Sequence, residues 1–201
     1  MVKLLLLNFK VSCYRILEWI RVVFLYYPRF LLTDLKLASQ YLIHNPYKLC
    51  KLDYGETPLT TLDKIASECR ILSKDTVIEL GCGTGRTCFW LRSFVKCKVV
   101  GVDLLAPFIE KACSVRSDVE FRQEDILTTE LNGTVIYFYG TSFSDDFIKK
   151  LCEKCASLPQ KTRFITVSYP LSDYNSRFRT LKEFEGRFPW GRTSIYLSQL
   201  C

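Results

Sequence analysis

Short apolar runs alternate with helical patterns along the chain from about residue 58 onward. A short apolar run bounded by glycine, an acid or a turn pair indicates a strand. The strands predicted in this way are residues 77–79, 98–102, 119–122, 134–139, 163–169, 178–190 and 192–200. Helices are predicted for residues 84–95, for a segment that starts near Leu105, and for a segment after Ser144 that ends at about Ser157. A further helix is expected to begin at Pro58 with Thr57 as its cap.

The first of these strands ends in an acid, Glu79, and runs into a glycine-rich loop. The loop places glycines at alternate positions, with Cys82 between the first two: Gly81, Gly83 and Gly85. Glycine leaves a bare backbone that a ligand can approach closely. The helix that follows presents its free N–H groups to the same ligand. The sequence therefore predicts a strand, a ligand-binding loop and a helix.

Three kinds of ligand loop share this general form, and Arg86 separates them. A phosphate-binding loop needs Gly-Lys-Ser/Thr where this chain has Arg86-Thr87. A dinucleotide loop needs its third glycine at position 86, which disfavours an NAD(P)-dependent oxidoreductase. The third form, acid-x-Gly-x-Gly-x-Gly, is filled completely by residues 79–85.

Asp103 ends the next strand, 22 residues after Gly81. An acid about 20 residues after a nucleotide-binding glycine loop accepts hydrogen bonds from ribose hydroxyls. A carboxylate suits this role because it only accepts hydrogen bonds and can take two hydroxyls at once. The alternative is that Asp103 caps the helix that starts near Leu105. The glycine loop in register favours the ribose role.

With these motifs the chain resembles the class I S-adenosylmethionine-dependent methyltransferases. The resemblance covers residues 51–201 and implies an α/β fold, a three-layer Rossmann-like sandwich with a mostly parallel seven-stranded sheet and an antiparallel last strand. It implies S-adenosylmethionine as the cofactor. Residues 1–50 are expected to form a separate helical extension.

The resemblance also assigns roles to residues at the strand ends. Asp125, or its neighbour Glu124, is expected to accept a hydrogen bond from the adenine amino group, with Ile126 against the ring; a solvated acidic turn is the alternative. Glu56 or Thr57 is expected to reach the amino-acid end of the cofactor, unless this stretch is a plain helix start. The candidate cofactor-binding residues are Glu79, Gly81, Cys82, Gly83, Gly85, Asp103, Leu104, Asp125, Ile126 and Tyr139.

The loop after the fourth strand should face the methyl group, because ligands of open α/β sheets lie at the carboxyl ends of the strands. Tyr139, Thr141 and Ser142 are the candidate catalytic residues there. The loop lacks the Asp/Asn-Pro-Pro-Tyr pattern of base and glutamine methylation and carries no obvious metal-binding acid or general base. Methyl transfer can proceed by alignment of donor and acceptor. The chain loosely resembles the ATP synthase c-subunit lysine methyltransferase group.

Residues 1–50 differ from the rest in composition, since their seven Lys/Arg and two acids give +5 of the formal +7. Residues 11–27 predict a basic amphipathic helix and residues 31–43 a second helix. Residues 1–30 are therefore expected to lie on a membrane surface or to contact protein. The nearly balanced remainder lacks the basic surface of a nucleic-acid binder, so no nucleic-acid partner is expected.

The chain has ten cysteines and no visible secretion signal, which indicates reduced, buried thiols. The protein is therefore expected to be cytoplasmic. If the leader, residues 1–50, binds lipid, the protein is expected to be peripheral on the inner face of a membrane. His44 is the only histidine, and Cys152 and Cys155 lack two further zinc ligands, so no metal site is expected.

The sequence therefore predicts an S-adenosylmethionine-dependent methyltransferase. Its acceptor is left open between a protein lysine and a membrane-associated or small molecule, and the oligomeric state is left open as well. The alternative function is a non-catalytic cofactor-binding scaffold that the leader recruits to a membrane or a partner protein.

Overall fold

A computed structural model describes residues 55–141 and 143–201. The predicted helices at 11–27 and 31–43, the whole extension of residues 1–50, and Ser142 lie outside the described residues. The elements are α4 (Leu59–Glu68), β1 (Thr76–Leu80), α5 (Arg86–Trp90), the π-helix η3 (Leu91–Val95), β2 (Lys98–Asp103), α6 (Ala106–Val115), β3 (Glu120–Gln123), β4 (Val135–Phe138), α7 (Asp145–Cys155), β5 (Arg163–Val167), the 3-10 helix η4 (Leu171–Asp173), β6 (Phe178–Phe188) and β7 (Gly191–Leu200).

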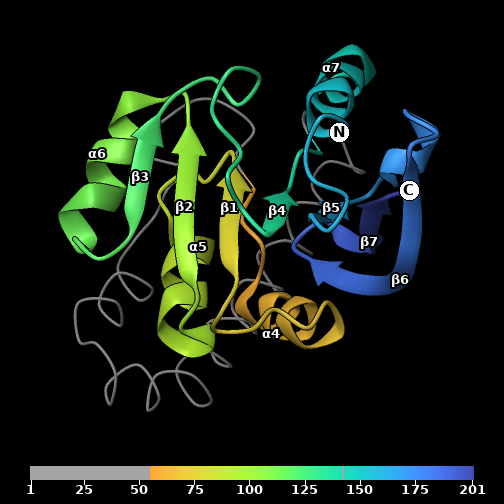
Figure 1. Ribbon diagram of the computed structural model, residues 1–201. Coiled ribbons are helices and arrows are strands. Elements are labelled where there is room, and N and C mark those ends of the chain that lie inside the picture. The colour runs from red at the N-terminus through yellow and green to blue at the C-terminus, as the bar shows by residue number, and fades with distance from the viewer. Residues whose placement is uncertain (1–54, 142) are drawn as a thin grey trace, which may run out of the picture.

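The strands form one seven-stranded sheet in the order β3-β2-β1-β4-β5-β7-β6 (Figure 1). Strands β1 to β5 are parallel, whereas β7 runs antiparallel to both of its neighbours, β5 and β6. The predicted parallel sheet with an antiparallel last strand is confirmed. Because the order reverses between β1 and β4, their carboxyl ends border the place where such sheets bind ligands.

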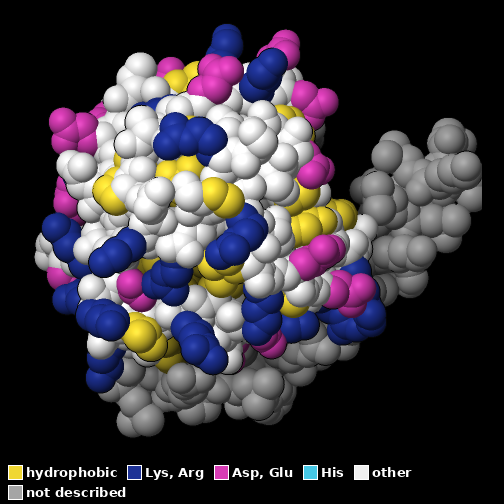
Figure 2. Space-filling model, turned by 45° about the vertical axis from the view of Figure 1, so that its right-hand side comes forward, with side chains coloured by type: hydrophobic (Ala, Val, Ile, Leu, Met, Phe, Trp, Pro, Cys, Tyr) yellow, Lys and Arg dark blue, Asp and Glu magenta, His cyan; other side chains and the backbone are white. Residues whose placement is uncertain are grey.

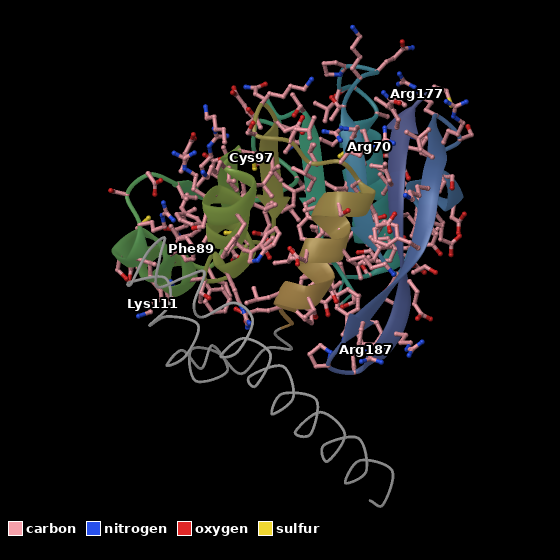
Figure 3. The ribbon with its side chains drawn as sticks, turned by 90° about the horizontal axis from the view of Figure 1, so that it is seen from below. Arg70, Phe89, Cys97, Lys111, Arg177 and Arg187 are labelled. Carbon is pink, nitrogen blue, oxygen red and sulfur yellow. The ribbon has the colours of Figure 1, made fainter. Side chains whose placement is uncertain are left out.

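Successive side chains of each strand point to opposite faces, so each strand supplies two cores. Val77 of β1 joins the core under α4, α5 and α6, and its neighbour Ile78 joins the core under α7. Figure 3 shows α4 and α5 side by side on the first face. The layers are therefore unequal: on the second face α7 is the one α-helix among the described residues, joined by the short η4.

Two helix boundaries differ from the sequence prediction. Pro58 has an extended backbone (ψ 146°), so α4 begins at Leu59 and Thr57 does not cap it. The Thr57 hydroxyl instead pairs with the Tyr137 hydroxyl of β4 in the buried core. The predicted helix 84–95 begins only at Arg86, after Gly85 in the left-handed region, and continues from α5 into the π-helical turn η3.

Surface charge on the described residues is mixed. Basic, acidic and apolar side chains are interspersed on the face in Figure 2, with basic ones more numerous in its lower part. Six of the eight described cysteines are free and buried, as the composition predicted. None of the helices within residues 55–141 and 143–201 is long and apolar enough to cross a membrane.

Asp75 is a buried carboxylate that joins three segments at the amino ends of the strands, at the opposite end of β1 from the glycine loop. It accepts hydrogen bonds from the Leu72 N–H at 2.7 Å and the Thr134 hydroxyl at 2.9 Å, and pairs with the Arg163 guanidinium at 2.8 Å. Arg163 also donates to the Cys69 carbonyl. Burial alone raises the pKa of Asp75, but these donors together hold it below its ordinary value.

Asp75→Ala should lower the free energy of unfolding by roughly 3 kcal/mol at pH 7, because it leaves Arg163 partly buried without its partner. A group with a lowered pKa stabilises the fold above its unfolded pKa, and this contribution is lost as the pH falls through the folded pKa. The gap between wild type and variant should therefore shrink toward pH 3 in urea denaturation. Exposed Asp173→Ala is the control, and a loss below about 1 kcal/mol would contradict the structural role.

Candidate active site

The loop from β1 to α5 has a left-handed backbone at each of its three glycines. Gly81, Gly83 and Gly85 have φ angles of +75°, +53° and +81°. A Cβ at Gly81 would meet no atom within 4 Å, so the loop faces open space there. A Cβ at Gly85 would lie 2.7 Å from the Phe121 ring. The first glycine thus exposes bare backbone, whereas the third lets the loop pack closely against β3.

The carboxylate of Asp103, at the end of β2, fixes this loop. Its Oδ2 accepts a hydrogen bond from the Gly83 N–H at 2.8 Å, and its Oδ1 accepts one from the Leu105 N–H at 2.9 Å. The second bond lies before α6, whose N-cap residue is Leu105 and which has no side-chain cap, so Asp103 does not act as the cap of this helix. Each carboxylate oxygen can accept more than one hydrogen bond, so the partly exposed Asp103 retains acceptor capacity for two hydroxyls.

Glu79 lies behind the loop rather than in open space, with a residual exposure of 5%. Its Oε2 accepts a hydrogen bond from the Cys88 thiol at 3.0 Å, which ties β1 to α5. Burial raises the pKa of Glu79 to about 8, the Cys88 and Thr87 hydrogen bonds oppose this, and the charges of Glu56 and Asp103 add to it. The side chain is therefore mostly protonated at neutral pH. Cys82 is also buried.

Helix α5 is held against the sheet by an aromatic contact. Phe89, which is labelled in Figure 3, meets Phe121 of β3 edge-on with ring centroids 5.5 Å apart. Because Phe121 also lies against Gly85, the helix, the loop and β3 share one packing centre.

The segment before α4 lies over the glycine loop. Glu56 pairs with Arg86 at 2.9 Å and accepts a hydrogen bond from the Thr84 hydroxyl at 3.5 Å. A Cβ at Gly55 would lie 3.0 Å from the Tyr139 ring, so this glycine rests against β4's end. Arg86, the residue that replaces a third dinucleotide glycine, thus has a structural use: it fastens residues 55–58 to the loop.

The remaining candidate cofactor contacts differ in accessibility. Leu104 is 65% exposed beside Asp103, and Asp125 is also exposed. The Asp125 side chain accepts a hydrogen bond from the Leu127 N–H at 2.8 Å, as an acidic turn would. Glu124 accepts one from the Thr129 hydroxyl. Ile126 is buried among the residues under α7, whereas Leu104 is an exposed apolar side chain beside Asp103.

A cavity of about 450 Å³ lies beyond the ends of β4 and β5. The loop after β4, the first turns of α7, the chain after β5 and the β6–β7 hairpin supply its walls. The residues that line it are Thr141, Phe143, Asp145, Ile148, Ser168, Tyr169, Tyr174 and Trp190. Of the predicted catalytic residues, Thr141 lines this cavity and Ser142 lies outside the described residues.

Tyr139 stands between the glycine loop and the cavity. Its ring stacks on Phe188 with centroids 5.3 Å apart, and its hydroxyl accepts a hydrogen bond from the Trp190 Nε1 at 2.9 Å. Phe188 stacks in turn on Trp190 at 5.4 Å. The hairpin that carries these rings is braced by α4, where Lys64 donates to the Glu185 carbonyl at 2.8 Å. Tyr139 is thereby held by one ring stack and one hydrogen bond.

Sequence reasoning missed the aromatic walls of the cavity. Phe143, Tyr169, Tyr174 and Trp190 come from four separate segments, so no local spacing connects them. The available signals were weak: Tyr169 ends the predicted fifth strand, and Trp190 falls at the break between the last two strands.

Comparison with known proteins finds one matching domain model and many structures with a similar fold. The family model described as "Methyltransferase domain" matches residues 71–166, slightly less than half of the chain. No curated protein sequence matches significantly. Many solved structures do, all of the following below 25% identity, so that their likeness concerns the fold.

An RNA methyltransferase from Salinibacter ruber, in complex with S-adenosyl-L-homocysteine, superposes with a TM-score of 0.60 at 19% identity, over 72% of this chain and 93% of that chain. Magnesium protoporphyrin IX methyltransferase from Synechocystis PCC 6803, with bound SAM, gives 0.58 at 15%, over 71% and 79%. MtNAS, in complex with MTA and tNA, gives 0.61 at 18%, over 71% of this chain and only 60% of that chain. This chain thus spans less than two thirds of MtNAS.

The glycine loop, Asp103, the sheet order and the matched family model agree. Residues 71–166 match a methyltransferase-domain model, and the sheet has the fold of the S-adenosylmethionine-dependent methyltransferases among the similar structures. The observed site suits S-adenosylmethionine: open space faces Gly81, Asp103 keeps acceptor capacity for ribose hydroxyls, and exposed Leu104 offers an apolar surface.

The raised pKa of Glu79 gives a pH dependence of stability. An acid whose folded pKa exceeds its unfolded value of 4.5 keeps a proton that the unfolded chain releases, so the fold loses stability as the pH rises from there toward about 8. The slope is roughly 1.4 kcal/mol per pH unit for one proton.

Glu79→Gln cannot ionise and should lack this loss. Between pH 5 and pH 8 the wild type should lose a few kcal/mol relative to the variant in urea denaturation. Exposed Glu110→Gln on α6 is the control and should follow the wild type. Parallel profiles for wild type and Glu79→Gln would show that the carboxyl is not held in its neutral form.

Proposed function

We propose that the protein binds S-adenosylmethionine across the ends of β1, β2 and β3 and methylates an acceptor that enters through the cavity beyond β4 and β5. One observation carries this proposal: the loop site and the cavity lie at the same end of the sheet. The Asp103–Gly83 hydrogen bond and the aromatic cavity are both at the carboxyl ends of parallel strands, with Tyr139 between them. The match of residues 71–166 to a methyltransferase-domain model favours this enzyme over a non-catalytic scaffold.

Each residue at the cofactor end has a distinct task in this proposal. Asp103 accepts the ribose hydroxyls while it holds Gly83, Gly81 lets the cofactor approach the backbone, and Leu104 covers one face of the adenine. Asp125 or Glu124 accepts from the adenine amino group, as the family resemblance implies. Glu79 acts indirectly, because its buried carboxyl holds the loop's two flanks together through Cys88.

When bound, S-adenosylmethionine supplies an electrophilic methyl group to a nucleophile. The chain's task is then to align that nucleophile and to keep water away from it. Tyr139, fixed by Phe188 and Trp190, forms the wall between the two sites. Thr141, and Ser142 by its place in the sequence, are proposed to position the acceptor with their hydroxyl groups.

The acceptor class and the location of the protein extend the proposal. A protein lysine and a membrane-associated or small molecule both suit a cavity whose walls are largely aromatic. The mixed surface charge of the described residues and the basic leader support a cytoplasmic protein that contacts a membrane surface through residues 1–30 and has no nucleic-acid partner.

Asp103→Ala should weaken S-adenosylmethionine binding by about 10-fold or more, since it removes charge-assisted hydrogen bonds and frees the loop. Isothermal titration calorimetry of the full chain measures this affinity. The control is Asp118→Ala, an exposed acid in the turn before β3, away from the strand ends. Equal affinities for wild type and Asp103→Ala would contradict the proposed site.

A further inference from the structure

The cavity beyond β4 and β5 is walled by aromatic faces that packing holds in place. Phe143 stacks on Phe147 with centroids 4.4 Å apart. Tyr169 and Tyr174 meet edge-on at 6.1 Å, and Trp190 stacks on Phe188. Phe143, Tyr169 and Trp190 are each supported by a ring that does not line the cavity, and Tyr174 is held by Tyr169 and Asp145, so an occupant finds these faces already arranged.

Charge in the cavity is of one sign. Among the described residues that line it, Asp145 is the only one with a charged side chain, and none is Lys or Arg. The Asp145 Oδ1 accepts a hydrogen bond from the Tyr174 hydroxyl at 2.9 Å. This contact fixes the direction of the carboxylate and leaves its other oxygen for a donor on the occupant. Thr141 and Ser168 add neutral hydroxyl groups.

The backbone at one wall carries local strain. Ser168 has a φ of +78°, in the left-handed region that a residue with a Cβ rarely adopts. Its N–H donates to the Ser194 carbonyl at 2.9 Å, and its hydroxyl accepts from Thr193 at 3.0 Å, so β7 holds it in this conformation. Such strain gathers at binding sites, which supports a functional role for this wall.

Aromatic faces and a single carboxylate together select a cation. The face of an aromatic ring attracts an ammonium group within about 6 Å, most strongly for tryptophan. A carboxylate attracts the same group and repels an anion. A neutral ring would gain the stacking alone, and a phosphorylated or carboxylated acceptor would meet Asp145 without a compensating Lys or Arg.

We infer that the acceptor is an organic ammonium, that is, an amine that is protonated at neutral pH and carried on an apolar or aromatic body. This inference rests on the proposed function and names its substrate class. The ammonium head lies between the Asp145 carboxylate and the Trp190 and Tyr174 rings, and the apolar body contacts Phe143 and Ile148. The amine releases one proton to solvent before its nitrogen lone pair can accept a methyl group.

Three probes of similar shape and different charge test the inference: benzylammonium, benzyl alcohol and benzoate. Their binding to the full chain is measured by calorimetry at pH 7, with S-adenosylmethionine titrated separately. Benzylammonium should bind about 10-fold more tightly than benzyl alcohol, and benzoate should bind most weakly. The inference is overturned if none of the probes binds, or if the alcohol or the benzoate binds as tightly as the cation.

Two variants of the first turn of α7 provide the matched comparison. Asp145→Asn should abolish the preference for the cation, whereas Asp146→Asn, which removes an adjacent exposed charge outside the cavity, should preserve it. An equal loss in both variants would attribute the preference to the general field of the helix end and would contradict a cation site. Circular dichroism verifies that both variants fold.

Trp190→Leu is the second test, since this side chain is 44% exposed and forms one aromatic wall of the cavity. It should weaken benzylammonium binding about 5-fold, and Trp190→Phe should restore part of it. Unchanged binding in Trp190→Leu would contradict the role of this ring. S-adenosylmethionine binding separates the two claims: if the wild type fails to bind it, the proposed function fails, whereas cofactor binding without a cation preference contradicts the ammonium inference alone.

Discussion

The hydrogen bond from the Gly83 N–H to the Asp103 carboxylate is the constraint on which the site depends. It joins the loop after β1 to the end of β2, so the backbone with its left-handed glycines is fixed at the edge where parallel strands present ligands. The same carboxylate orders the start of α6 through Leu105. One acid therefore positions the loop, orders Leu105 before α6 and keeps acceptor capacity for a bound nucleoside.

Behind this contact, buried polar groups replace what would otherwise be ordinary apolar packing. Glu79 is mostly protonated near neutral pH, because burial raises its pKa to about 8 against the opposing hydrogen bonds of Cys88 and Thr87. The hydroxyl groups of Thr57 and Tyr137 form a hydrogen bond in the core. At the amino ends of the strands, the ion pair of Asp75 and Arg163 joins β5 to the segment before β1. Polar groups that are buried and paired specify one arrangement of their elements, since any other arrangement leaves them unsatisfied. Separate contacts therefore fix the carboxyl ends and the amino ends of the strands.

The parts of the fold that the sequence predicted are those with local signals. The glycines at alternate positions and the short apolar runs are local signals, and Asp103 was identified by its regular spacing of 22 residues from Gly81. The strands and the antiparallel end followed from them and from the family resemblance. The role of Thr57 was mispredicted because the competing partner, Tyr137, lies 80 residues away. The aromatic cavity was not predicted for the same reason, because its rings come from segments far apart in the sequence. Ile126, in the chain after β3, belongs to the core under α7.

The central claim is that the cofactor lies across the glycine loop with its ribose on Asp103. A crystal structure of the full chain soaked with S-adenosyl-L-homocysteine tests it most directly. The account predicts density for the nucleoside over Gly81, with two ribose hydroxyls on the Asp103 carboxylate and the sulfur end directed toward Tyr139. Density elsewhere on the chain, or a glycine loop that leaves no room for the nucleoside, would contradict it.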